Sequence, residues 1–267
     1  MDHFDISVHR SMAEIDATLW QSCFGTHDPF LSWDFLHGLE TSGCTTTESG
    51  WQPAHLRLER DGEPVGFLPA YLKTHSYGEY VFDWSWADAW QRMGLRYFPK
   101  LVTAVPFTPA TGQRWGLVED DANDPIALAA CGKALCESLE ISSWHLLFVD
   151  QENSERLTDA SMPQRLTTQF HWFNQSYRDF QDFLDRFSSR KRKNLRRERE
   201  HIAKQGLALS TLKGKEIELE HWQFFHRCYQ TTYAKRSGHG GYLTGSFFTD
   251  VCPSLGQTPV MVIAEHR

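Results

Sequence analysis

A segment between residues 73 and 88 carries acidic and imidazole side chains that could move a proton. It contains His75, Glu79 and Asp83 among Tyr, Trp and Phe residues. An apolar setting raises the pKa of a carboxyl group toward the working pH of a general base. We therefore expect Glu79, Asp83 and His75 to be the catalytic residues. The competing interpretation is structural, with Asp83 and Asp88 capping a helix and the aromatic rings forming core.

A basic run at residues 190–204 is the sharpest local charge feature, with eight Lys or Arg residues against two Glu in a chain of net charge −7. A helical projection divides these cations between one flank and an outward face. The flank carries Arg192, Arg196 and Arg199, and the outward face carries Arg190, Lys193, Arg197 and Lys204.

Guanidinium groups match phosphate oxygens in a bidentate manner, so the basic run predicts a site for the anionic part of a substrate. The expected ligands are Arg190, Arg192, Lys193, Arg196 and Arg197. RNA is a second polyanion that such a run would bind without reading its sequence. A solvated helix face is the structural alternative.

The cysteines and histidines do not predict a metal site. Six cysteines are scattered over 267 residues without a Cys-x-x-Cys pair, and none lies with histidine at zinc-ligand spacing. We expect reduced thiols, no metal and no prosthetic group. No stretch reaches the roughly 18 apolar residues of a membrane helix, and the N-terminus lacks the apolar core of a secretory signal, so the expected location is cytoplasmic.

Hydrophobic spacing predicts the elements that position the 73–88 segment. The turn dipeptide Asp61-Gly62 indicates an antiparallel hairpin, and the aperiodic stretch 77–115 is expected to be irregular. The expected elements are helices at 12–23 and 30–41, hairpin strands at 55–60 and 64–73, a helix at 125–139, and an interior strand at 144–149. Together they predict a mixed sheet in the first part of the chain.

A second unit is expected to begin near Tyr177 and to open like the first. Its expected elements are one long helix with an apolar stripe from Phe180 to Ile202, a strand at 207–212, a helix at 219–236, and a strand at 259–264. Because the chain stops soon after that strand, we expect this unit to be incomplete and the strand to form an exposed edge. The predicted domains are 1–176 and 177–267, with the basic helix at 188–205.

Four longer motifs resemble one family. They are Gly50-Trp-Gln-Pro-Ala-His-Leu, His75-Ser-Tyr-Gly-Glu-Tyr-Val-Phe-Asp-Trp, Tyr97-Phe-Pro-Lys-Leu and Val105-Pro-Phe-Thr-Pro-Ala-Thr-Gly. Together they are similar to the FemAB-like predicted N-acyltransferases of peptidoglycan biosynthesis or recognition, and the 188–206 helix is similar to the basic helix that opens the second domain of Fem ligases. The resemblance marks a set of substrate-binding candidates in or beside these motifs, which are Lys73, Tyr77, Asp88, Lys100 and Thr108.

The resemblance implies an α/β fold of two GNAT-like domains in tandem and transfer of an acyl or aminoacyl group to an amine. Aminoacyl-tRNA or acyl-CoA would be the donor, and a peptidoglycan precursor or another small molecule the acceptor. The pyrophosphate loop of acyl-CoA enzymes is matched only in part, by Gln91-Arg-Met-Gly-Leu-Arg, whose last residue departs from the Gly or Ala of that motif. The alternative function is a non-catalytic module that binds an anionic polymer such as RNA.

Overall fold

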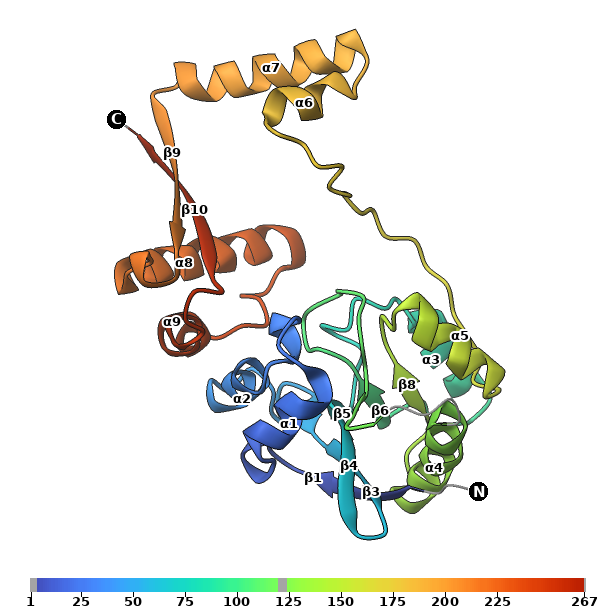
Figure 1. Cartoon of the computed structure of the whole chain (residues 1–267). Helices are drawn as coiled ribbons and strands as arrows, with labels where there is room; N and C mark the ends of the chain where they lie inside the picture. The colour runs from blue at the N-terminus through green and yellow to red at the C-terminus, as the bar shows by residue number, and fades with distance from the viewer. Residues whose placement is uncertain (1–3, 120–123, 267) are drawn as a thin grey trace. The chain divides into compact units, whose positions relative to one another are not determined.

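The chain separates into two compact units in its computed structural model, which describes residues 4–119 and 124–266. The first unit comprises residues 1–164 and 218–256, and the second comprises 165–217 and 257–267. Figure 1 shows the elements of each unit. The predicted domains, 1–176 and 177–267, instead divided the chain at one point, within the 163–177 stretch that has no regular secondary structure.

Two short sheets organise the first unit. One is antiparallel, in the order β1 (Asp5–His9), β3 (His55–Arg60), β4 (Glu63–Leu68) and β7 (Gly116–Leu117). The other has the order β2 (Trp51–Pro53), β5 (Ala70–Lys73), β6 (Lys100–Thr103) and β8 (Trp144–Leu146), and β6 runs parallel to β8. The amide of Ala54 donates to the carbonyl of Ala70 at 2.8 Å and joins the two sheets. The predicted mixed α/β class is confirmed.

The predicted hairpin at Asp61-Gly62 is confirmed, but its second strand, predicted at 64–73, divides into β4 and β5, which belong to different sheets. Its turn residues Asp61 and Gly62 have φ values of 53° and 82°, the left-handed conformation that a two-residue hairpin turn requires. The register shifts at Leu58/Glu59, where a β-bulge bends the ladder. This hairpin carries the chain into β5, whose last residue is Lys73.

Helices cover both sides of these strands (Figure 1). Their bounds are α1 (Ala17–Phe24), α2 (Trp33–Thr41), α4 (Asp124–Ser138) and α5 (Gln151–Asp159), with 3₁₀ turns at Met12–Glu14 and Pro29–Leu31. The side chains of Asp16, Ser32 and Asp150 accept hydrogen bonds from backbone amides and cap α1, α2 and α5. On one side Trp20 of α1 packs against Phe67, and on the other Leu128 of α4 joins the core with Leu56 and Leu101.

The prediction that residues 77–115 are irregular is wrong in two places. Helix α3 (Trp84–Arg92) and strand β6 lie within this stretch. Helix α3 is nine residues long and buries none of its side chains. Strand β6 is four residues long and buries all of them, including the charged Lys100, so it lacks the alternation that marks a half-buried strand.

Two further strands differ from expectation. Strand β8 ends at Leu146 and lies at the end of its sheet, not in the interior, because it pairs only with β6 in the described residues. Strand β1 was not predicted. It pairs with β3 along its whole length from Asp5 to His9, but none of its side chains is buried.

The segment 218–256 completes the first unit. It contains α8 (Leu219–Ser237), a π-helical turn at Phe247–Val251 and the short α9 (Cys252–Ser254). The ring of Phe247 packs edge-on against Phe35 of α2, at 6.0 Å between centroids. The hydroxyl of Thr244 donates to the carbonyl of Ser42 at 2.8 Å. Residues 200 positions apart in the chain therefore share one packed layer.

The second unit holds α6 (Phe180–Asp185), α7 (Ser189–Lys204), β9 (Leu207–Lys213) and β10 (Val260–His266). The predicted long helix is interrupted at residues 186–188, and α7 begins at Ser189. Serine side chains, here Ser188 and Ser189, favour helix ends over helix interiors. Strand β10 pairs with β9 in antiparallel register and with no other strand among the described residues. Among the described residues, no strand pairs with the other edge of β10.

Candidate functional site

A buried charge cluster centred on Lys100 forms where β6 meets the segment after β5. The ammonium group of Lys100 donates to Asp83 Oδ2 at 2.7 Å, Glu79 Oε2 at 2.8 Å and Ser76 Oγ at 3.1 Å. The hydroxyl of Tyr97 also donates to Asp83 Oδ2, at 2.7 Å. These five side chains are called the Lys100 cluster below.

The two carboxylates of the cluster have different proton affinities. Burial raises the pKa of Glu79, and the attraction of Lys100 and Lys73 only partly opposes this effect. Burial also acts to raise the pKa of Asp83, but hydrogen bonds from Lys100, Tyr97 and Ser76 outweigh it, so that pKa is lowered. Glu79 is therefore the better proton acceptor at neutral pH.

Each carboxylate leaves one oxygen without a hydrogen bond. Glu79 Oε1 and Asp83 Oδ1 are buried and have no partner among the described residues. A buried polar atom without a partner costs stability, so structural sites rarely contain one. Two such atoms in one cluster are typical of a site arranged for a ligand or a reaction.

Lys73 lies beside the cluster. It pairs directly with Lys100 in the β5–β6 register, and its own side chain is completely buried. Its Nζ lies 3.8 Å from the centroid of the Trp51 ring and donates to the carbonyl of Tyr77 at 3.3 Å. Burial lowers the pKa of Lys73 to about 7.

His75 lies at the margin of the cluster. Its Nδ1 accepts from the amide of Tyr77 at 3.2 Å, and its ring occupies the space that a side chain at Gly50 would need. Burial, and then the charge of Lys73, lower the pKa of His75, so the imidazole is neutral at pH 7. The structure thus brings all three predicted catalytic residues to one region.

Within the described residues, the side chains of three predicted substrate-binding residues form no hydrogen bond or ion pair with the cluster. Tyr77 is 56% exposed and contributes its carbonyl. Asp88 lies on the exposed surface of α3 and pairs with Arg92 one turn later. Thr108 donates to the carbonyl of Pro106 at 3.0 Å. The capping interpretation also fails for Asp83, because it precedes α3 but its side chain makes no capping hydrogen bond.

Sequence reasoning missed three residues of this region, namely Tyr97, Ser76 and Trp51. Tyr97 and Ser76 supply donors or acceptors within the cluster, and Trp51 forms the wall beside Lys73. Tyr97 shares a quoted motif with Lys100, Ser76 shares one with Glu79, and Trp51 lies in a third. Their roles depend on strand pairing, which the motifs do not show. Gly78 permits the close packing here: a side chain at this position would lie 2.7 Å from Phe107, and its φ of 78° favours glycine.

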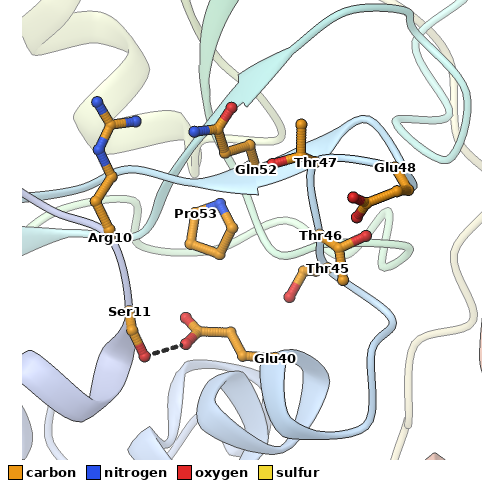
Figure 2. A pocket seen from close by; sticks show the side chains of 9 residues that line it. All are labelled: Arg10, Ser11, Glu40, Thr45, Thr46, Thr47, Glu48, Gln52 and Pro53. Carbon is orange, nitrogen blue, oxygen red and sulfur yellow. Dashed lines mark hydrogen bonds between the residues drawn. The ribbon is translucent and has the colours of Figure 1, made fainter.

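Another carboxylate, Glu40, is partly buried and lies in an open polar pocket of the same unit. Figure 2 shows Glu40 facing Ser11 across the pocket floor, with Arg10 and Glu48 at its rim. Glu40 accepts from Ser11 at 2.6 Å and from the amide of Met12 at 3.0 Å, and it pairs with His55 Nε2 at 2.8 Å. Burial opposes ionisation here, but these contacts outweigh it and lower the pKa of Glu40.

The basic helix α7 lies in the second unit and divides as its sequence predicted. Arg192 donates to Asp185 at 3.1 Å, Arg196 donates to Gln181 at 2.7 Å, and Arg199 lies 4.0 Å from the centroid of the Phe180 ring. These partners all belong to α6. The outward cations form what we call the basic face of α7, and none of them has an ion pair within the described chain; they are Arg190, Lys193, Arg197 and Lys204.

No metal centre or membrane helix is visible in the described parts of the chain. Within residues 4–119 and 124–266 no group of three or more His, Cys, Asp or Glu side chains could hold a metal ion. No helix of the same residues is both long enough and apolar enough to span a bilayer. The cysteines described are free thiols.

Comparison with known proteins gives one match. A family model named FemAB-like, described as peptidoglycan biosynthesis or recognition, matches residues 11–267. This range includes the Lys100 cluster, the pocket around Glu40 and the basic face of α7. Searches of the curated proteins and of the solved structures found no match.

Proposed function

We propose that this chain, which belongs to the FemAB-like family of peptidoglycan biosynthesis or recognition, transfers an acyl or aminoacyl group to an amine. The family match supports a role in peptidoglycan biosynthesis or recognition, and the reaction is our inference from the Lys100 cluster. The single observation that carries it is the Glu79 carboxylate, which is buried and has a raised pKa and one oxygen without a partner. A carboxylate in this state is suited to remove a proton from an attacking amine.

The roles within the cluster follow from its hydrogen bonds. Lys100 fixes the position of both carboxylates through one ammonium group. Asp83 remains ionised and balances that charge, while Glu79 accepts the proton. Glu79 and Asp83 are each 2% exposed, so the side chains that cover them must move to admit an acceptor. The exposed rings of Tyr77 and Phe82 mark where it would approach.

The reaction replaces a carbonyl–leaving group bond with a carbonyl–nitrogen bond. The amine nitrogen attacks the acyl carbon, the leaving group departs with the bonding electrons, and the amine proton passes to Glu79. The donor would be acyl-CoA or aminoacyl-tRNA, and the acceptor a peptidoglycan-precursor amine. No metal or prosthetic group takes part in this scheme.

A transfer assay tests this function. The full chain is incubated with either donor class and an amine-bearing precursor peptide, and the acceptor mass is measured. We expect an acyl or aminoacyl mass increase, and we expect Glu79→Gln to slow transfer by about 100-fold or more because a general base is lost. Glu137→Gln, on the exposed surface of α4, is the matched control. Equal transfer by both variants would exclude Glu79 as the base.

The basic face of α7 supports a second candidate function, the binding of RNA or another anionic polymer. Four outward cations on one helix face have no ion pair in the described chain, and such a surface attracts phosphates. Binding to RNA should then weaken steeply with salt, with a slope set by the number of released counterions. A steep slope without any transfer product would favour a binding module. Weak salt dependence with competition by CoA or a UDP-sugar would favour the enzyme.

A further inference from the structure

Two buried lysines stand side by side in the first unit. Lys73 on β5 and Lys100 on β6 are paired residues of neighbouring strands, and both are 0% exposed. Like charges directly opposite one another destabilise a sheet, and burial adds to that cost. The pair is therefore difficult to explain if both groups carry a charge.

Hydrogen bonding distinguishes the two lysines. Lys100 has three side-chain acceptors between 2.7 and 3.1 Å, which match the three donors of an ammonium group. Lys73 has one hydrogen bond in the described chain, at 3.3 Å, to a Tyr77 carbonyl that also accepts from the Trp51 indole at 3.0 Å. The Trp51 ring attracts a cation, but one ring does not replace two missing acceptors. The surroundings of Lys73 therefore suit an amine.

Two titratable groups act on Lys73 from the elements around it. They are Glu79 in the segment after β5 and Lys100 on β6. Lys73 in turn acts on His75, whose pKa is lowered first by burial and then by the charge of Lys73. Burial lowers the pKa of Lys73 to about 7, Glu79 opposes the change and Lys100 adds to it. Burial raises the pKa of Glu79. The two shifts bring the proton affinities of Lys73 and Glu79 closer together, and the charge of each group acts on the other.

We propose that Lys73 is the proton-holding partner of Glu79: it is a neutral amine in the resting site and takes the proton that Glu79 receives from the acceptor. This inference rests on the proposed transfer function. The amine nitrogen forms the new bond, the leaving group keeps its electron pair, and the released proton moves from Glu79 to Lys73. The resulting ammonium group loses the proton to solvent before the next cycle. Lys73 is a positioning residue, because it acts through Glu79.

Lysine-selective NMR tests the inference without any substrate. The full chain is labelled with ¹³C at the lysine Cε atoms, and each resonance is followed from about pH 5 to about pH 11. Lys73→Met identifies the Lys73 signal by its disappearance. We expect that signal to titrate with a midpoint near 7, as burial dictates. A midpoint at or above about 10 would show an ordinary ammonium group and overturn the proposal.

The variant Glu79→Gln tests the coupling between Glu79 and Lys73. Glu79→Gln removes the charge that holds up the Lys73 midpoint, so we expect that midpoint to fall by about one pH unit. Glu137→Gln on the exposed surface of α4 should leave it in place. An unchanged midpoint in a folded Glu79→Gln protein would contradict a shared proton.

A second measurement covers the case in which Glu79→Gln does not fold. In the unmodified chain, the ¹³Cδ signal of Glu79 should show a step at the pH of the Lys73 midpoint, because two groups that share a proton titrate together. Absence of that step would overturn the coupling. Failure of either titration leaves the transfer assay standing, and absence of transfer leaves the titrations standing, so the two proposals can fail separately.

Discussion

The Lys100 cluster and the basic face of α7 use the same kinds of cation in opposite surroundings. Lys100 is completely buried, and its ammonium group is surrounded by three side-chain oxygens. The basic face of α7 is exposed along its length and has no ion pair in the described chain. A buried charge interacts strongly with its neighbours, whereas water and salt screen an exposed one. The two regions should therefore respond to different perturbations, the first to loss of a partner and the second to salt.

The largest difference is expected in folding stability when Lys100 is removed. Lys100→Met leaves two carboxylates buried together without a cation, which should lower the free energy of unfolding by about 3–5 kcal/mol at pH 7. Urea denaturation measures the loss. Lys133→Met, at an exposed position of α4, is the matched control and should change stability by less than about 0.5 kcal/mol. Similar losses in both variants would contradict the role given to Lys100.

The next effect is a pH dependence that belongs to Lys73. Its pKa is about 7 in the folded protein and 10.5 as the ordinary value, so the unfolded chain binds more protons between these limits. Stability should therefore rise with pH from about 7 to about 10, by up to roughly 1.4 kcal/mol per pH unit from this group. Below pH 7 the amine is protonated in both states and the contribution is constant.

Lys73→Met should remove that slope. Urea denaturation of both proteins at about pH 7, 8 and 9 isolates the contribution of Lys73, because other titrating groups are common to the two. The difference in the free energy of unfolding should change by about 1 kcal/mol for each pH unit. Parallel curves for the two proteins would contradict a neutral Lys73.

A smaller effect is expected at Glu40, whose partly buried carboxylate has hydrogen-bond partners. Glu40→Gln should lower the free energy of unfolding by about 1–3 kcal/mol, since an amide cannot accept from Ser11, Met12 and His55 together. Because the pKa of Glu40 is lowered, its contribution is present above the ordinary value of 4.5 and is lost as pH falls through the folded pKa. The rim residue Glu48, mutated to Gln, serves as the control. Equal losses in the two variants would contradict a stabilising role for the contacts of Glu40.

The smallest stability effect is expected on α7. Reversing Arg190, Lys193 and Arg197 to Glu should change stability by less than about 0.5 kcal/mol per position but abolish binding to RNA at low salt. Reversing Arg192 and Arg196 should cost more stability, because both contact α6. Thermal unfolding and a salt-titrated binding assay give the two readouts. Loss of stability in the first set and not in the second would reverse the assignment of the faces.

The sequence predicted the elements that carry a periodic pattern or a turn signal. The β3–β4 hairpin was recognisable because Asp61-Gly62 favours the left-handed turn that joins its strands. The division of α7 into two faces followed from helical geometry alone and agrees with the contacts to α6. Helix α3 and strand β1 were not predicted; α3 buries no side chain, and the five residues of β1 are exposed or only partly buried.

The candidate site was predicted in composition but not in arrangement. His75, Glu79 and Asp83 were identified from their place in an aromatic segment, and Lys100 from a motif. The pairing of Lys73 with Lys100 depends on β5 meeting β6, two strands separated by a stretch with no recognisable turn. The contrast between the two lysines arises from tertiary contacts and cannot be read from residue types.

The first unit is built from two stretches of chain with residues 165–217 between them. Thr244 follows its partner Ser42 by 202 residues. Because ribosomes add about 5–20 residues each second, Thr244 is synthesised roughly 10–40 s after Ser42. The delay between synthesis of Phe35 on α2 and of its partner Phe247 is similar. Throughout that interval the emerging polypeptide presents an apolar helix surface to the crowded cell. Its yield in living cells should therefore depend on chaperones that shield nascent chains.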